Sequence, residues 1–122
     1  MSAVQETQKV KMISTSDIQG LFKYCFGCEP EVIPKKALLC PFLKVKDLNE
    51  KCEITQTFKG RLYSGIIASK NSSNFVAVSC GIGTQAAGDA AALLASAGVN
   101  DIVFAGSCGG LGETKLGDLI AC

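Results

Sequence analysis

The stretch that decides the fold is FVAVSCGIGTQAAGDAAALLASAGVNDIVFAGS, residues 75–107. An apolar, β-branched run typical of a strand leads into a glycine turn, and Thr84 is placed to cap a helix that runs to about Ala97 and is ended by Gly98. A second apolar run, 101–107, predicts a buried strand. Strands that alternate with a helix and are continuously apolar indicate an α/β fold, with flanking helices and a mixed sheet that is parallel at least in part.

Upstream of this stretch, the sequence predicts a short helix and a strand. In SDIQGLFKYCFG (16–27), apolar residues recur at helical spacing, Ser16 is expected to be the N-cap, and Gly27 suits the C-terminal stop. The apolar run KKALLCPFL (35–43) has the length of a buried strand, whose far end Pro41 places at an edge or a bend.

The remaining segments are read from turn formers and charge. RLYSGIIAS (61–69) and FVAVSC (75–80) are separated by a cluster of turn formers, which predicts an antiparallel hairpin. KVKDLNEKCE (44–53) is charged and is expected to be a surface helix or loop. CGGLGETKLG (108–117) is expected to be a glycine-rich loop, and DLIAC (118–122) the start of another strand.

Composition excludes several classes of protein. The chain has 122 residues, of which 48% are hydrophobic and 19% charged, with a formal net charge of +1, so we expect one globular domain rather than a disordered chain. We divide it into an N-terminal arm with a short helix (1–35) and an α/β domain (36–122). Arg61 is the only arginine, so no basic stripe points to nucleic acid.

Membrane and secretory segments are also missing from the pattern. The N-terminus lacks the apolar core of a signal peptide, and the apolar stretch around 86–99 is short and interrupted by Asp89. Seven cysteines outside a secretory context suggest reduced, mostly buried thiols, so we expect a cytoplasmic protein. Cys25 and Cys28 form a C-x-x-C pair, but the chain has no histidine to help complete a zinc site, so we do not expect one. The pair falls at a helix end rather than at a helix start after a strand, so we do not expect thiol chemistry from it either.

The first glycine turn has the order G-x-G-x-x-A, with Gly81, Gly83 and Ala86. A dinucleotide-binding fold would also need an acid at the end of the next strand to hold the ribose hydroxyls. The nearest acid, Asp101, lies at the beginning of that strand instead, and its end reads AGSCGG. The dinucleotide interpretation therefore fails on this point, which leaves a tight turn for helix packing or a different ligand.

The second glycine loop follows the next strand and contains Gly106, Ser107 and Gly109. In an open α/β sheet, ligands bind beyond the carboxyl ends of the strands. Two successive strands that both end in glycine loops at this edge are expected to form the floor of one pocket. The alternative that the glycines only permit a sharp turn stays open.

Residues 80–122, CGIGTQAAGDAAALLASAGVNDIVFAGSCGGLGETKLGDLIAC, resemble the central block of the nucleoside phosphorylase and nucleosidase superfamily. This superfamily includes purine nucleoside phosphorylases, uridine phosphorylases and methylthioadenosine nucleosidases. Its pattern is a G-[IM]-G turn, a small-residue helix, a strand, G-[ST]-x-G and G-D-[LIV]. The resemblance implies cleavage of the N-glycosidic bond of a nucleoside, by phosphate or by water, without cofactor or metal.

The resemblance also assigns roles to single residues. Gly83 matches the family glycine beside the nucleophile, Ser107 matches the Ser or Thr that contacts phosphate or the sugar, and Gly106 and Gly109 match the glycines of the same loop. We expect Gly117 and Asp118, which match the G-D pair, to be structural.

Three departures from the family pattern limit what the resemblance implies. Where some phosphorylases carry a phosphate-binding arginine, this chain has Phe104, which tilts the expectation toward the nucleosidases that use water. Arg61 is expected to be an ordinary surface arginine. No convincing water-orienting glutamate follows the first strand, where Lys44, Asp47 and Glu50 are the candidates.

The family's ribose-binding and base-protonating residues lie beyond the matched block. We therefore expect the chain to correspond to the N-terminal half of the family domain and to be inactive alone. The expected partners are a nucleoside or purine base, phosphate for the phosphorylase branch, and further copies of the chain. The alternatives are a non-catalytic binding or assembly module of the same fold and, less favoured, a nucleotide-binding Rossmann-like protein.

Overall fold

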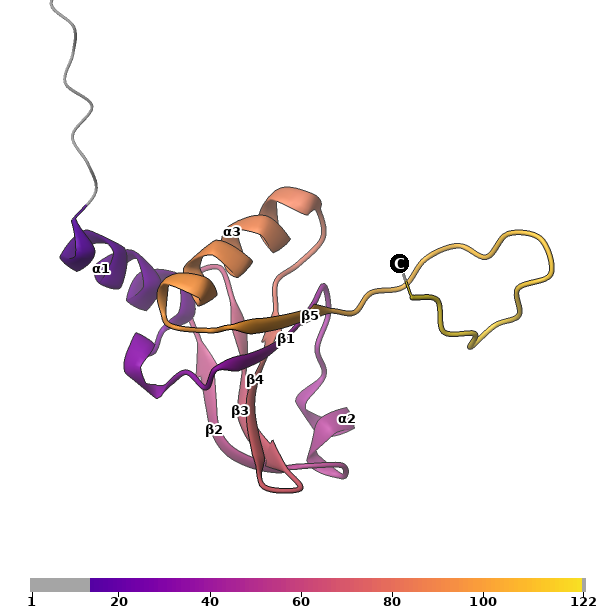
Figure 1. Ribbon diagram of the computed structural model, residues 1–122, viewed down its shortest axis with the longest axis horizontal. Coiled ribbons are helices and arrows are strands. Elements are labelled where there is room, and N and C mark those ends of the chain that lie inside the picture. Colours follow the sequence, from indigo (N-terminus) through magenta and orange to yellow (C-terminus); the bar gives the residue numbers. More distant parts are fainter. Residues whose placement is uncertain (1–13, 122) are drawn as a thin grey trace, which may run out of the picture.

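Residues 14–121, which the computed structural model describes, form a five-stranded sheet with helices on both faces (Figure 1). The elements in chain order are α1 (Thr15–Phe26), the 3-10 turn η1 (Pro30–Val32), β1 (Lys36–Cys40), α2 (Val45–Asn49), β2 (Glu53–Lys59), β3 (Ser64–Lys70), β4 (Ser73–Ser79), α3 (Thr84–Ser96) and β5 (Asp101–Phe104).

The sheet has the strand order β2-β3-β4-β1-β5 and is mixed. Strand β1 lies in parallel between β4 and β5, whereas β2, β3 and β4 are joined in antiparallel pairs. The turn between β3 and β4 has positive φ at Asn71 (51°) and Ser72 (64°), as a two-residue hairpin turn requires. The α/β fold class, the hairpin and the bend at Pro41 after β1 are thus confirmed.

The main core lies between the sheet and the face covered by α1 and α3. Phe22 and Phe26 of α1 are fully buried, and the ring of Phe26 lies 4.4 Å from that of Phe22 and 4.9 Å from that of Tyr63, measured between centroids. A smaller cluster around Ile66 and Ala77 lies on the opposite face, toward α2. Burying both faces of the sheet in this way is what continuously apolar strands require.

Helix α1 begins earlier than the sequence pattern indicates. Its N-cap is Ser14, whose hydroxyl accepts a hydrogen bond from the backbone N–H of Asp17 (3.2 Å), while the Asp17 carboxylate accepts one from the backbone N–H of Ser14 (3.2 Å). The prediction of Ser16 as the cap is therefore wrong, because Asp17 at the third helical position completes a capping box only with Ser14. Gly27 ends the helix with a left-handed φ of 70°, as expected.

Helix α3 is covered on one side only. Ala90 and Leu94 are fully buried against the sheet, whereas most residues on the other side of this alanine-rich helix are exposed. Thr84 is its first residue rather than its N-cap, so that prediction is wrong: the cap position is Gly83, with φ of 111°, and no side chain caps the helix.

Strand β2 is the element that the sequence pattern misses. The charged segment 44–53 contains α2, as expected, but the chain then enters a seven-residue edge strand that pairs with β3. Most of its side chains are exposed, and only Phe58 is buried. A strand with so little apolar content carries a weak signal, because edge strands bury little.

Strand β5 forms where it was expected but is not buried. It pairs only with β1 and lies at the edge of the sheet, so Val103 and Phe104 are 63% and 55% exposed. Residues 105–121 then form a loop that includes the one expected at 108–117 and contains no further strand. The prediction of a strand from Asp118 onward is therefore wrong for residues 118–121, and Cys122 lies outside the described residues. The expected N-terminal arm lies largely outside them too, and the division at residue 35 stays a prediction.

Candidate functional site

The parallel strands β4, β1 and β5 have their carboxyl ends along the same border of the sheet, which we call the carboxyl edge. A glycine segment follows β4 and another follows β5. In the register of the sheet, Cys40 of β1 lies opposite Ser79 of β4, and Leu39 lies opposite Phe104 of β5. The glycine turn 81–83 and the glycine loop that starts at Gly106 therefore leave the same edge, on either side of β1 (Figure 1). This is the edge at which the sequence places the candidate site.

The first glycine segment forms the N-terminus of α3. Gly81 and Gly83 have φ of 79° and 111°, and a side chain at either would meet nothing within 4 Å. The backbone conformation, rather than crowding, is thus what requires glycine here. The N–H of Gly81 donates to the carbonyl oxygen of Pro41 (3.0 Å), so this glycine ties the turn to the end of β1.

The first turn of α3 presents free backbone donors. The helix has no side-chain cap and no acidic residue in its first turn, and its first internal hydrogen bond runs from the N–H of Ala87 to the carbonyl of Gly83 (3.2 Å). The N–H groups before Ala87 therefore point out of the helix end, where the helix dipole favours negative charge. The hydroxyl of Tyr63 donates to the carbonyl of Ala86 (3.2 Å) and holds this turn against the sheet. Such an arrangement can bind an anion.

The second glycine segment is open to solvent. The N–H of Ala105 makes a last ladder bond to Leu39 (2.9 Å), after which Gly106, Ser107 and Gly109 are exposed. In Figure 1 the following loop extends away from the sheet. The structure thus places both candidate segments at one edge but shows no contact between Gly83 and Ser107, and their union in one pocket stays a prediction.

Gly117 and Asp118 lie farther along the same loop and shape it. Gly117 has φ of 96°, and the carboxylate of Asp118 accepts a hydrogen bond from the backbone N–H of Lys115 (2.8 Å). Asp118 therefore closes a local turn, in keeping with the structural role expected for this pair.

Two thiols and a phenol near the first turn of α3 have raised pKa values. Burial raises the pKa of the Cys80 thiol, which directly precedes the turn, and that of the Cys25 thiol on α1. Burial and the nearby carboxylate of Asp89 raise the pKa of the Tyr63 phenol. A thiol with a raised pKa is a poor nucleophile, so these groups serve the core rather than the chemistry.

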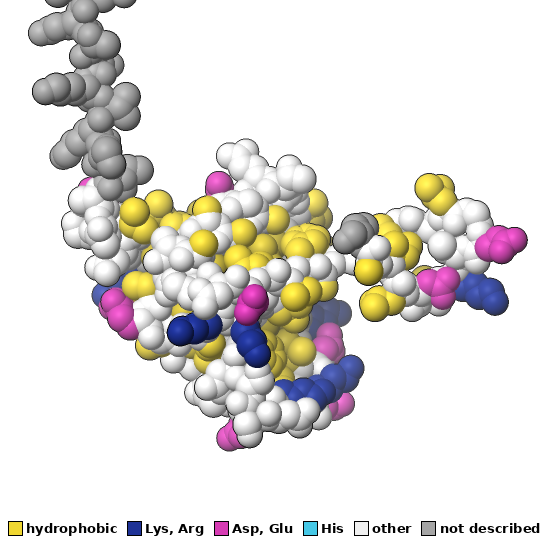
Figure 2. All heavy atoms as spheres, viewed as in Figure 1, with side chains coloured by type: hydrophobic (Ala, Val, Ile, Leu, Met, Phe, Trp, Pro, Cys, Tyr) yellow, Lys and Arg dark blue, Asp and Glu magenta, His cyan; other side chains and the backbone are white. Residues whose placement is uncertain are grey.

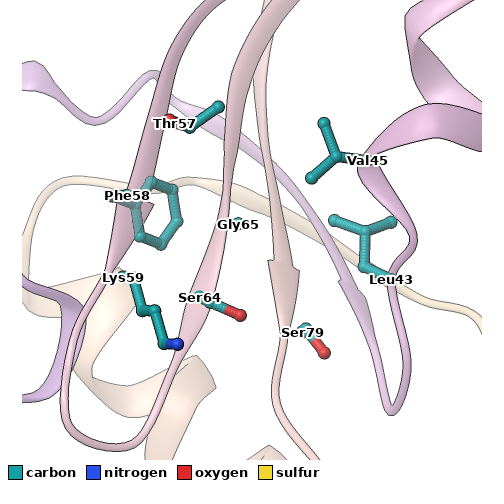
Figure 3. A pocket seen from close by; sticks show the side chains of 8 residues that line it. All are labelled: Leu43, Val45, Thr57, Phe58, Lys59, Ser64, Gly65 and Ser79. Atoms are coloured by element: carbon teal, nitrogen blue, oxygen red, sulfur yellow. The ribbon is translucent and has the colours of Figure 1, made fainter.

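A hollow of about 250 Å³ lies beside this edge on the α2 face (Figure 3). Its lining comes from the segment after β1 and from β2, β3 and β4: Leu43, Val45, Thr57, Phe58, Lys59, Ser64, Gly65 and Ser79. The sequence pattern does not indicate this hollow, because it does not identify β2 as a strand whose side chains lie beside those of β3.

Comparison with known proteins identifies the family. A family model described as the phosphorylase superfamily matches residues 37–122, well over half of the chain. The chain belongs to the phosphorylase superfamily. No curated protein and no solved structure matched it.

The superfamily match agrees with the resemblance drawn from the glycine segments. It runs from Ala37 in β1 to Cys122 and contains all four candidate binding residues, Gly83, Gly106, Ser107 and Gly109. The mixed sheet with its flanking helices is consistent with a phosphorylase-like fold.

Other kinds of site find no support in the described part of this superfamily member. Residues 14–121 hold no group of three or more His, Cys, Asp or Glu side chains that could bind a metal ion. Cys25 and Cys28 are both buried, and both are free thiols. No helix among these residues is long and apolar enough to cross a membrane.

Proposed function

We propose that this chain provides the nucleophile side of a nucleoside-binding site in an enzyme that cleaves the N-glycosidic bond. The observation that supports this proposal is the uncapped N-terminus of α3, which follows a glycine turn at the carboxyl edge of β4 within the span of the superfamily match. Its free N–H groups would hold the attacking anion or water below the sugar.

The chemistry of the bond explains why such a site suits the task. As the bond between C1′ and the base nitrogen breaks, its electron pair leaves with the base, and the sugar gains oxocarbenium character while an oxygen of phosphate or water approaches C1′. A site accelerates this step when its dipoles match the charges of the transition state better than those of the bound substrate. In the proposal, Gly83 and the first turn of α3 orient the nucleophile, and Ser107 with Gly106 and Gly109 contacts phosphate or the ribose.

The last residue of β5 bears on the choice of nucleophile. Phe104 offers no charge to an oxyanion, and Arg61, the chain's one arginine, is exposed while its backbone N–H donates to the carbonyl of Tyr24 (3.1 Å) near the end of α1. We therefore favour water over phosphate at the position below the sugar.

We propose further that the isolated chain binds its ligand without turning it over. The first turn of α3 has no acidic residue, and the sequence has no histidine. Neither kind of side chain is therefore present at this helix end to protonate the leaving base. Lys44, Asp47 and Glu50, the candidates after β1, are exposed on or beside α2. The same observation favours the second candidate function, a non-catalytic nucleoside- or anion-binding module, if no partner supplies the acid.

Ligand-induced changes in melting temperature test the binding proposal. Adenine or methylthioadenosine at millimolar concentration is expected to raise the melting temperature of the purified chain, and NAD is not. Stabilisation by NAD alone would contradict the proposal. Measured release of base from methylthioadenosine by the isolated chain would instead contradict the proposed lack of turnover.

A matched pair of serine variants tests the assigned binding loop. Ser107→Ala is expected to reduce the nucleoside-dependent stabilisation at least severalfold, because it removes a direct contact. Ser96→Ala, at the far end of α3, changes an exposed serine whose hydroxyl donates to the carbonyl of Leu93 (2.6 Å) and is expected to leave the stabilisation unchanged. Equal effects of the two variants would count against a binding role for Ser107.

We also propose the cellular setting and the assembly of the chain. The six cysteines in the described residues are all free thiols, which suits a reducing compartment such as the cytoplasm. We propose that the chain forms a homo-oligomer, because large apolar side chains along β5 and the following loop are exposed. A purine is the proposed base.

A further inference from the structure

A row of polar side chains crosses three neighbouring strands on the α2 face of the sheet. Lys59 of β2 lies opposite Ser64 of β3, and Ser64 lies opposite Ser79 of β4. Residues directly opposite each other in a sheet project to the same side, so these three side chains stand next to one another. Figure 3 shows them along the lower part of the hollow, across from Leu43 and Val45.

The hollow over this row is small and has one cationic group. Its volume of about 250 Å³ lies below the roughly 300–1,000 Å³ that is typical of pockets for drug-sized ligands, so it suits a small ion or fragment. Leu43 and Val45 form an apolar wall on one side of the hollow. Lys59 is the only charged residue of the lining.

The charge of Lys59 is not neutralised by the described part of the chain. The ion pair in residues 14–121 joins Lys23 to Glu29 and does not involve Lys59. The Lys59 ammonium thus has no carboxylate partner in residues 14–121, and the Ser79 hydroxyl in the same row donates only a long hydrogen bond, to the carbonyl of Pro41 (3.3 Å).

The backbone that carries Lys59 is held firmly in place. The N–H groups of Arg61, Leu62 and Tyr63 donate to the last carbonyls of α1, at distances of 3.0 to 3.2 Å. A side chain at Gly27 would lie 2.3 Å from the carbonyl oxygen of Lys59, so the end of α1 is packed directly on the end of β2. The origin of the Lys59 side chain is therefore fixed relative to Ser64 before any ligand binds.

We propose that Lys59, Ser64 and Ser79 bind a small oxyanion in this hollow, with inorganic phosphate as the probe. The ammonium of Lys59 supplies the charge and Ser64 donates a hydrogen bond from its hydroxyl. Ser79 exchanges its long hydrogen bond to the carbonyl of Pro41 (3.3 Å) for one to the anion. The site uses none of the candidate nucleoside-binding residues, so it stands apart from the proposed function.

Titration with phosphate, followed by backbone amide NMR shifts at constant ionic strength in sodium chloride, tests this proposal. We expect saturable shifts at residues 59, 64 and 79, a dissociation constant at least fivefold weaker in Lys59→Met, and retained binding in Lys59→Arg. Lys70→Met is the matched control, because Lys70 is an exposed lysine at the other end of β3, and it should bind phosphate like the parent chain.

Two results would overturn the proposal: no saturable binding to the parent chain, or binding to Lys59→Met as tight as to the parent. A second titration, with ribose 5-phosphate, distinguishes a free ion from the phosphoryl group of a larger molecule. Tighter binding than inorganic phosphate identifies a phosphate ester as the ligand, and equal or weaker binding identifies the free ion. The shifts at residues 59, 64 and 79 report this site, whereas shifts at Gly83 and residues 106–109 report the proposed nucleoside site, so the failure of one proposal is distinguishable from the failure of the other.

Discussion

Gly65 is a residue at which the sheet leaves no room for a side chain. A Cβ atom there would lie 2.0 Å from the carbonyl oxygen of Ala77 in the neighbouring strand and 2.8 Å from the ring of Phe58. The obstructing oxygen belongs to the backbone of β4, so it cannot move without breaking the pairing of β3 and β4. Gly88, in contrast, lies on the exposed side of α3, where a Cβ atom would meet nothing within 4 Å.

These two glycines make opposite predictions for the same substitution. Gly65→Ala is expected to lower the free energy of unfolding by about 3 kcal/mol, because overpacking forces the strands apart. Gly88→Ala is expected to raise it by about 0.5–1 kcal/mol, since alanine favours a helix over glycine. Urea unfolding followed by circular dichroism measures both free energies. If Gly65→Ala and Gly88→Ala change the free energy of unfolding by similar amounts in the same direction, the close approach of β3 and β4 is wrong.

At the residue scale, the sequence reveals some candidate site residues and hides others. Gly83 could be found because a glycine between a strand and a helix is a local pattern. Lys59 could not, because its significance depends on its alignment with Ser64 and Ser79, which lie on two other strands. The family pattern directs attention to a cation on β5, where this chain has Phe104. The structure instead has a lysine on β2, the outer strand at the other end of the strand order.

At the scale of elements, the start of α1 shows how one hydrogen-bond pair sets a boundary. The reciprocal bonds between Ser14 and Asp17 close a capping box, while the Ser16 hydroxyl only contacts that of Ser14 (2.9 Å). Ser14→Ala is expected to lower the free energy of unfolding by about 1 kcal/mol. Ser16→Ala is the control and is expected to change it by less than about 0.5 kcal/mol. The reverse order of the two effects would restore Ser16 as the cap.

The same capping box predicts a dependence on pH. The hydrogen bonds from Ser14 lower the pKa of the Asp17 carboxyl in the folded chain. The unfolded state then binds more protons than the folded state as the pH falls below about 4, so the stabilisation is present above that pH and is lost below it. The stability difference between the parent chain and Ser14→Ala should therefore shrink between about pH 5 and pH 2, as measured by urea unfolding at each pH.

Elements that bury a whole apolar run were predictable, and elements at the edges were less so. The β3–β4 hairpin and α3 carry strong local patterns, and both contribute buried residues to the main core. Strand β2 exposes most of its side chains and was missed, and β5 was expected to be buried although it is an edge strand. Local sequence describes what a strand is able to bury, whereas its position in the sheet determines what is buried.

At the scale of the whole molecule, many of the exposed large apolar side chains lie around β5 and the loop that follows it. Along β5 and the glycine segments, Phe42, Ile82, Val103 and Phe104 are each more than half exposed, and Leu111, Leu116 and Leu119 are exposed on the following loop. Figure 2 shows hydrophobic side chains on the body of the molecule and on the extended loop. Strand β5 contains neither the lysine nor the proline that commonly protects an edge strand.

This surface predicts that the chain associates with itself through β5. Sedimentation velocity at increasing concentration is expected to show dimers or larger species, because pairing of two β5 edges satisfies backbone groups and buries Val103. Val103→Lys places a charge in that contact and is expected to weaken association at least tenfold. Leu21→Lys introduces the same charge at a half-exposed leucine on α1 and serves as the control. The contact through β5 is wrong if the control weakens association as much as Val103→Lys does. It is also wrong if the parent chain remains monomeric at about 100 μM. That concentration is roughly ten times the dissociation constant that about 7 kcal/mol of binding energy gives.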